Sequence, residues 1–128
     1  MDIPGQLEAL RHSVPGCTLV AFADLRTRLV LCVSAAKSRS QERLDELCFQ
    51  AAECFENGDT LATSLGVDEA DSHMRTNSVV LTPVETRVFI RPPDGDGEAL
   101  CCVCETADHT KDLARNAAQA LQQISGAI

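Results

Sequence analysis

Two short segments of the chain are apolar at both odd and even positions. Residues 17–24 have the sequence CTLVAFAD, and residues 98–106 have the sequence EALCCVCET. Successive side chains of a β-strand point to opposite faces of its sheet, so apolar residues at every position need cover on both faces. The two segments therefore predict strands inside a sheet that has helices on both sides.

Three further segments have the composition of strands. They are residues 29–36 (LVLCVSAA), 78–84 (SVVLTPV) and 86–92 (TRVFIRP). Only a short polar stretch separates residues 17–24 from residues 29–36, which predicts an antiparallel hairpin. The sequence Pro93-Asp-Gly-Asp-Gly97 predicts a second turn, because Pro and Gly favour tight chain reversal. Five strands are therefore expected.

Three segments have the apolar spacing of amphipathic helices, with steps of three and four residues. The first spans residues 3–13. The second follows Ser40, a candidate N-cap, and is expected to end or kink at Asn57-Gly58. The third follows the capping sequence at 108–110 and is expected to end at Gly126. The predicted order is α-β-β-α-β-β-β-α, in one domain spanning residues 1–128.

The middle helix is apolar over much of its circumference. Leu44, Leu47, Cys48 and Phe55 form one stripe, and Phe49 extends it sideways. A stripe of this width has more apolar surface than one face of a sheet can cover. The excess predicts contact with another chain.

Charge and composition exclude several classes of function. The formal net charge is −8, from 19 acidic and 11 basic residues, and the only aromatic residues are four Phe. An acidic chain repels phosphate backbones and anionic lipid surfaces, and stacking on bases needs exposed rings. We therefore expect no nucleic-acid or membrane partner. The first five residues have no charged lead or apolar run, so we expect no signal peptide. Seven Cys is an odd number without paired spacing, which favours the reducing cytoplasm.

Cys101 and Cys104 are the residues that most suggest chemistry. On a strand, positions three apart lie on opposite faces, which separates the two thiols. A zinc site needs a second pair of ligands, and no closely spaced Cys/His pair exists elsewhere in the sequence. Core thiols are the favoured interpretation, and a thiol or metal protein remains the alternative. No phosphate loop, serine elbow or other catalytic motif is present, so we expect no enzyme and no cofactor.

The element order and several short motifs resemble the Roadblock family of dynein light chains and small-GTPase regulators. The motifs are Val14-Pro15-Gly16-Cys17, the run Thr82–Arg91 (TPVETRVFIR) and Leu113-Ala114-Arg115. The resemblance covers about residues 3–126. It implies a profilin-like α/β (α+β) fold, a five-stranded antiparallel sheet covered by helices on both faces. The long helix would lie on one face and the terminal helices on the other.

The resemblance also implies a homodimer that pairs through the long helix and the third strand. By position, the interface would comprise Phe49, Ala52, Glu53, Phe55, Val79, Val80 and Leu81. The expected function is a non-catalytic protein-binding module, a scaffold or regulator of a small Ras-like GTPase or of a motor-type assembly. Besides the thiol or metal protein, a small-molecule sensor of profilin-like shape is a further alternative.

Overall fold

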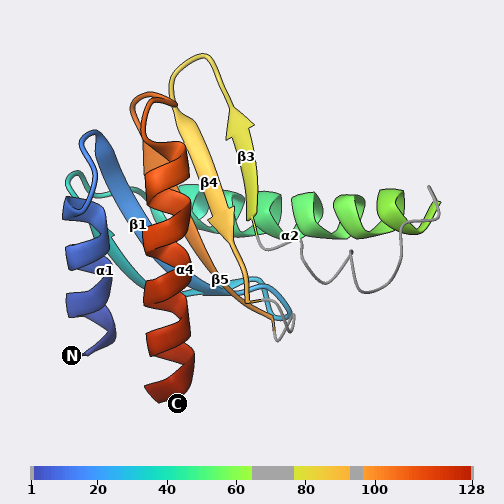
Figure 1. Cartoon of the computed structure of the whole chain (residues 1–128), viewed down its shortest axis with the longest axis horizontal. Coiled ribbons are helices and arrows are strands. Elements are labelled where there is room, and N and C mark those ends of the chain that lie inside the picture. Colours follow the sequence, from blue (N-terminus) through green and yellow to red (C-terminus); the bar gives the residue numbers. More distant parts are fainter. Residues whose placement is uncertain (1, 65–76, 93–96, 128) are drawn as a thin grey trace.

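A computed structural model describes residues 2–64, 77–92 and 97–127, and the structural statements below concern these residues. The elements follow the predicted order (Figure 1). They are α1 (Ile3–His12), β1 (Cys17–Asp24), β2 (Leu29–Ala35), α2 (Gln41–Ser64), β3 (Asn77–Leu81), β4 (Thr86–Ile90), β5 (Glu98–Cys104) and α4 (Thr110–Ala127).

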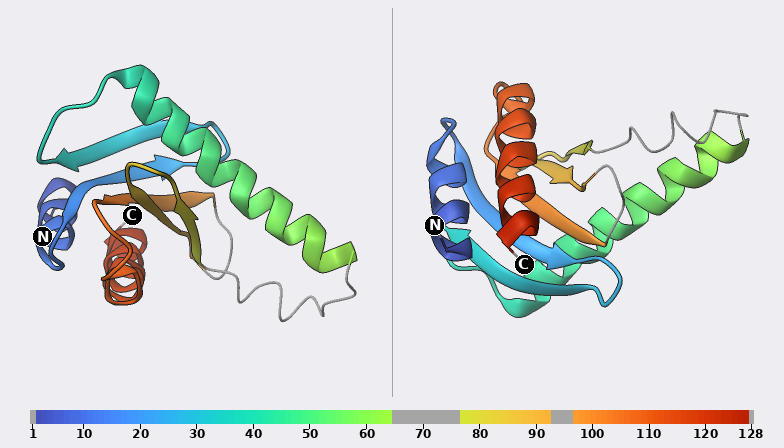
Figure 2. Two further views of the ribbon diagram at one scale, coloured as in Figure 1. Left: turned by 90° about the horizontal axis from the view of Figure 1, so that it is seen from above. Right: turned by 60° about the horizontal axis from the view of Figure 1, so that its bottom comes forward.

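The five strands form one antiparallel sheet in the order β2-β1-β5-β4-β3. Helices α1 and α4 lie on one face of this sheet, and α2 crosses the other face (Figures 1 and 2). This arrangement confirms the predicted fold class. Strands β1 and β5 lie inside the sheet, which explains why both are apolar at successive positions.

The core is divided into two clusters by the sheet. Leu100 and Cys102 of β5 pack in the cluster under α1 and α4, while Cys101 and Val103 pack in the cluster under α2. Alternation thus works as expected along β5. In β1 the register shifts between Cys17 and Leu19, and Cys17 joins the cluster under α1 and α4. Strict alternation along residues 17–24 predicts Cys17 on the same face as Leu19, and this prediction is wrong because of the shift.

Several element ends differ from the sequence-based expectation. Helix α2 continues through Asn57-Gly58 to Ser64, and α4 includes Gly126. A single Gly costs a helix only about 1 kcal/mol relative to Ala, so neither Gly is enough to end it. The N-cap prediction is confirmed, since the Ser40 hydroxyl accepts a hydrogen bond from the Arg43 amide at 3.3 Å.

Strand β3 ends at Leu81, three residues before the predicted end. The Thr82 amide donates to the Glu85 carbonyl at 3.0 Å, and the Thr82 hydroxyl accepts from the Glu85 amide at 3.0 Å. These bonds close a tight turn that contains Pro83, which has no amide hydrogen for a ladder. The sequence predicts no clear element over the polar segment 58–77, and residues 65–76 of it lie outside the described residues.

Candidate interaction surface

Strand β3 forms one margin of the sheet and pairs only with β4 in the described structure. Val80 points toward α2 and packs against the cluster beneath that helix. By alternation, Val79 and Leu81 point to the opposite face, where they are 48% and 70% exposed. An uncovered strand with large apolar side chains and unpaired backbone groups is a site at which another strand can add.

The four interface candidates on α2 fall into two groups. Ala52 and Phe55 are buried, and Phe55, only 5% exposed, is part of the core cluster between α2 and the sheet. Phe49 and Glu53 are exposed, Phe49 at 47%. The structure therefore leaves Phe49 and Glu53 accessible to a partner and assigns Ala52 and Phe55 to packing within the subunit.

Phe49 is held on the surface by an arginine from the β1–β2 turn. The Arg28 guanidinium lies 5.0 Å from the centroid of the Phe49 ring and 3.7 Å from the Glu56 carboxylate. Arg28 adopts a positive φ of 59°, because this turn has no Gly to take the left-handed conformation. Phe49 thus lies beside the β1–β2 turn, whereas Val79 and Leu81 lie on the opposite side of the sheet.

The exposed surface of α2 is acidic around Phe49. Over residues 41–57, where side-chain exposure is described, the exposed carboxylates of α2 are those of Glu42, Glu46, Glu53 and Glu56. Arg87 of β4 donates to Gln50 at 2.6 Å and approaches Glu46 to 3.9 Å, so with Arg28 at Glu56 two basic side chains are already engaged with this helix. A partner with basic and apolar groups is the best electrostatic match for this surface.

A carboxylate shared by two arginines ties the start of α2 to the β3–β4 turn. Glu85 accepts from Arg39 at 2.7 and 3.3 Å and from Arg87 at 2.9 Å. The hydrogen bonds from Arg39 lower the pKa of Glu85, burial opposes this effect, and the hydrogen bond from Arg87 lowers the pKa further. This cluster fixes the end of β3 relative to α2.

The second margin of the sheet was not among the predicted interface residues. On β2, Leu29, Leu31 and Val33 are exposed. The continuous apolar run LVLCV was no signal for such exposure, because runs of this kind are typical of strands inside a sheet. A register shift between Phe22 and Ala23 interrupts the β1–β2 ladder, and such a bulge makes an edge less suitable for pairing.

Cys101 and Cys104 are placed as core residues. Cys101 and Cys104 lie in different clusters on opposite faces of the sheet, as expected for positions three apart. Burial raises the pKa of Cys101, and a hydrogen bond with Cys17 together with burial raises the pKa of Cys104. Among the described residues no group of His, Cys, Asp and Glu is arranged to hold a metal ion. A thiol with a raised pKa is a poor nucleophile at neutral pH.

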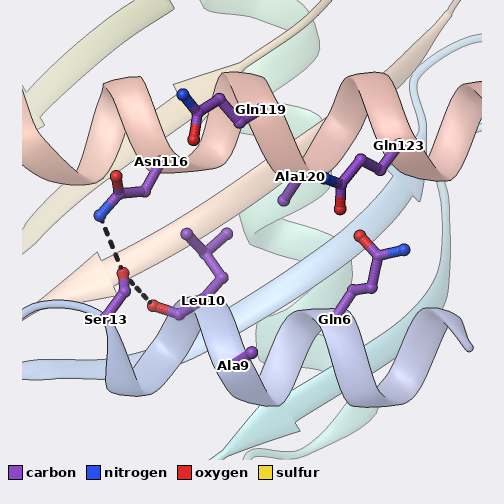
Figure 3. A pocket seen from close by; sticks show the side chains of 8 residues that line it. All are labelled: Gln6, Ala9, Leu10, Ser13, Asn116, Gln119, Ala120 and Gln123. Carbon is purple, nitrogen blue, oxygen red and sulfur yellow. Dashed lines mark hydrogen bonds between the residues drawn. The ribbon is translucent and has the colours of Figure 1, made fainter. Parts of the chain in front are cut away.

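A shallow hollow between α1 and α4 is lined by uncharged amides. Its volume is about 260 Å³, and Gln6, Asn116, Gln119 and Gln123 surround a base that includes Leu10 and Ala120 (Figure 3). The Asn116 amide donates to the Ser13 hydroxyl at 3.2 Å, and that hydroxyl donates to the Leu10 carbonyl at 2.7 Å. These bonds link the two helices.

No helix in the described ranges has the apolar length needed to cross a bilayer.

The chain was compared with known proteins by sequence and by structure. No protein-family model and no curated protein sequence matches it. Solved structures do match over nearly all of its length. A Roadblock/LC7 domain from Streptomyces avermitilis aligns with a TM-score of 0.79 at 16% identity, covering 99% of this chain and 98% of that one.

Two further matches are bacterial proteins of related fold. The gliding protein MglB from Thermus thermophilus aligns with a TM-score of 0.74 at 18% identity, covering 98% of this chain and 90% of that one. MglC from Myxococcus xanthus aligns with a TM-score of 0.69 at 8% identity, covering both chains completely. These matches and the observed topology establish that the chain has the fold of a Roadblock/LC7 domain.

Proposed function

We propose that the chain is a non-catalytic, homodimeric protein-binding module that works in the cytoplasm as a scaffold or regulator of a small Ras-like GTPase or a motor-type assembly. The observation that most supports this is the β3 margin beside α2, which no described strand covers, in a fold of the Roadblock type. One solved structure of similar fold is described as MglB with a tetrameric arrangement, so a protein of this fold assembles with itself.

The β3 margin is better suited to pairing with a second copy than the β2 margin. Strand β3 (Asn77–Leu81) contains no charged residue and no Pro, and its ladder with β4 has a continuous register. Charged side chains, Pro and bulges are the features that protect edge strands from pairing. Strand β2 has such a bulge opposite Phe22 and Ala23, whereas β3 has none of these features.

Two-fold pairing through β3 would extend the sheet across both subunits. In such an interface each residue of one copy meets the same surface of the other. Val79 and Leu81 of each copy would then be covered by the second copy. The two α2 helices would lie on one side of the joined sheet, with Phe49 and Glu53 at the surface they present together.

The acidic surface around Phe49 is the part of the module that we assign to a different protein. Across a two-fold axis, the carboxylates of Glu42, Glu46 and Glu53 in one copy would repel those in the other. This surface therefore interacts more favourably with a basic partner than with a second copy. A small GTPase is the partner class implied by the resemblance to Roadblock regulators. The partner would supply any nucleotide chemistry, because the sequence has no phosphate loop.

The proposal is tested first by sedimentation equilibrium at micromolar protein concentration. A dimer is the expected result, and a monomer over the whole concentration range would contradict the homodimer. The GTPase link is tested separately by purifying the chain from its native cells and identifying what is retained. Loss of a retained GTPase in a Phe49→Lys variant, with the dimer intact, is the expected outcome.

A further inference from the structure

The loop that leads into α2 forms a hollow with basic walls. Its volume is about 540 Å³, and its lining residues are Thr18, Ala36, Lys37, Ser38, Arg39, Ser40, Arg43 and Glu105. Three of the chain's 11 Lys and Arg residues are in this lining, in a protein whose net charge is −8. The local charge is therefore opposite in sign to the charge of the whole chain.

Backbone hydrogen bonds hold the walls of this hollow in place. The Ala36 amide donates to the Thr18 carbonyl at 2.9 Å, and the Glu105 amide donates to the Gly16 carbonyl at 2.9 Å. The Thr18 hydroxyl donates to the Val103 carbonyl at 3.4 Å. These bonds tie the lining to β1 and to the end of β5. A ligand would thus meet a preformed shape and lose little free energy in ordering it.

The three basic side chains have different roles. Arg39 is engaged by the Glu85 carboxylate at 2.7 and 3.3 Å, so it anchors the loop and its charge is compensated. Lys37 and Arg43 are exposed, and within the described ranges their side chains form no ion pair or hydrogen bond. These two cations are free to bind an anion. Glu105 opposes them, because its carboxylate lines the same hollow.

We infer that this hollow is a binding site for a phosphate group. Phosphate oxygens accept strong hydrogen bonds from a lysine ammonium and an arginine guanidinium, and they also accept from hydroxyls such as those of Ser38 and Ser40. The first turn of α2 adjoins the site, and the field at a helix start also favours an anion. The lining includes no residue of β3, although Arg39 links it through Glu85 to the β3–β4 turn. The phosphate belongs either to a small free ligand or to a phosphorylated side chain.

The test is a calorimetric and NMR titration of the full chain at constant ionic strength. Inorganic phosphate is one ligand, and a phosphoserine peptide with its unphosphorylated counterpart is the other pair. Saturable binding that shifts the signals of Lys37 and Arg43 is expected. Tighter binding of the phosphopeptide than of phosphate assigns the site to a protein ligand, and equal or weaker binding assigns it to a small ligand.

Charge variants of the site should change phosphate binding in both directions. A Lys37→Gln/Arg43→Gln double variant should weaken phosphate binding by more than about tenfold, because each charge-assisted bond contributes roughly a factor of ten. Glu105→Gln should strengthen binding, since it removes the opposing carboxylate. Lys111→Gln, on the exposed start of α4, is the matched control and should change nothing. Two results would overturn the inference. The first is equal phosphate binding by the double variant and the unmodified chain. The second is a response of the unmodified chain to sodium chloride that equals its response to phosphate.

Discussion

Val79 of β3 and Val88 of β4 are direct cross-strand partners on one face of the sheet, yet Val88 is fully buried while Val79 is 48% exposed. The cover provided by α4 therefore ends between these two strands. Leu81, two residues further along β3, is still more exposed. Nothing among the described residues covers these apolar side chains, and a second chain lying against the margin would remove them from water.

A Val79→Lys/Leu81→Lys double variant should be monomeric where the unmodified chain is dimeric. Two-fold pairing would bring like charges together, and we expect the dimer dissociation constant to rise by more than about tenfold. Both side chains are exposed in the subunit, so the fold should be retained. Sedimentation equilibrium measures the association, and circular dichroism checks the fold.

Leu31→Lys is the matched control for this variant. Leu31 is an exposed apolar residue on the other edge strand, β2, where the bulge disfavours pairing. Its substitution should leave the dimer unchanged. A dimer that survives the β3 variant and dissociates with Leu31→Lys would mean that the subunits meet through β2.

Phe55 and Phe49 differ sharply in what they contribute to stability. Phe55→Ala should lower the free energy of unfolding by about 3–5 kcal/mol, because it leaves a cavity between α2 and the sheet. Phe49→Ala should cost about 1 kcal/mol or less, since it removes an exposed ring and its contact with Arg28. Urea unfolding at a protein concentration below the dimer dissociation constant measures both. Similar losses for the two variants would contradict the packing described for α2.

The sequence was sufficient to predict the architecture and insufficient to predict the exposure of single residues. Strands apolar at every position, such as β5, identify the inside of a sheet because only cover on both faces permits them. The outward side of α2 could not be identified in the same way. Phe49 and Phe55 are both Phe on one helix, and only the direction in which α2 crosses the sheet makes Phe55 a core residue and Phe49 a surface one.

The element ends were the other part that the sequence could not specify. Gly is common at helix ends, but Gly58 and Gly126 both lie within helices. A local preference of about 1 kcal/mol is easily outweighed by the packing and hydrogen bonds of the whole helix. Ser40 was predicted correctly because its hydroxyl acts within its own turn, on the Arg43 amide, and needs no distant contact.

The thiols should react in an order set by their burial. Cys32 and Cys54 are partly exposed, while Cys101, Cys102 and Cys104 are buried and their pKa values are raised, mainly by burial for the first two and by the hydrogen bond with Cys17 for Cys104. A maleimide reagent applied to the native protein should label Cys32 and Cys54 first, as followed by peptide mass spectrometry. The same reagent in urea should label all seven. Fast labelling of Cys101 in the native protein would support the alternative of thiol chemistry.

The stability of the chain should depend on pH through Glu85. Arg39 lowers the pKa of Glu85 below its ordinary value of 4.5, so the folded chain binds a proton on this carboxylate less readily than the unfolded chain does. The ionised group therefore stabilises the fold fully above the unfolded-state pKa. This contribution is lost as the pH falls through the lower pKa of the folded state.

Replacing Glu85 by Gln should thus be costly at pH 7 and much less costly in acid. At pH 7 the variant should lose about 1–2 kcal/mol of unfolding free energy, since charge-assisted bonds to both Arg39 and Arg87 become neutral ones. The difference should shrink as the unmodified chain becomes protonated at Glu85. Urea unfolding at a series of pH values measures it, with Glu53→Gln as the control for removing one exposed carboxylate. A difference that stays constant from pH 7 down into the acid range would show that the Arg39–Glu85 pair does not stabilise the fold by its charge.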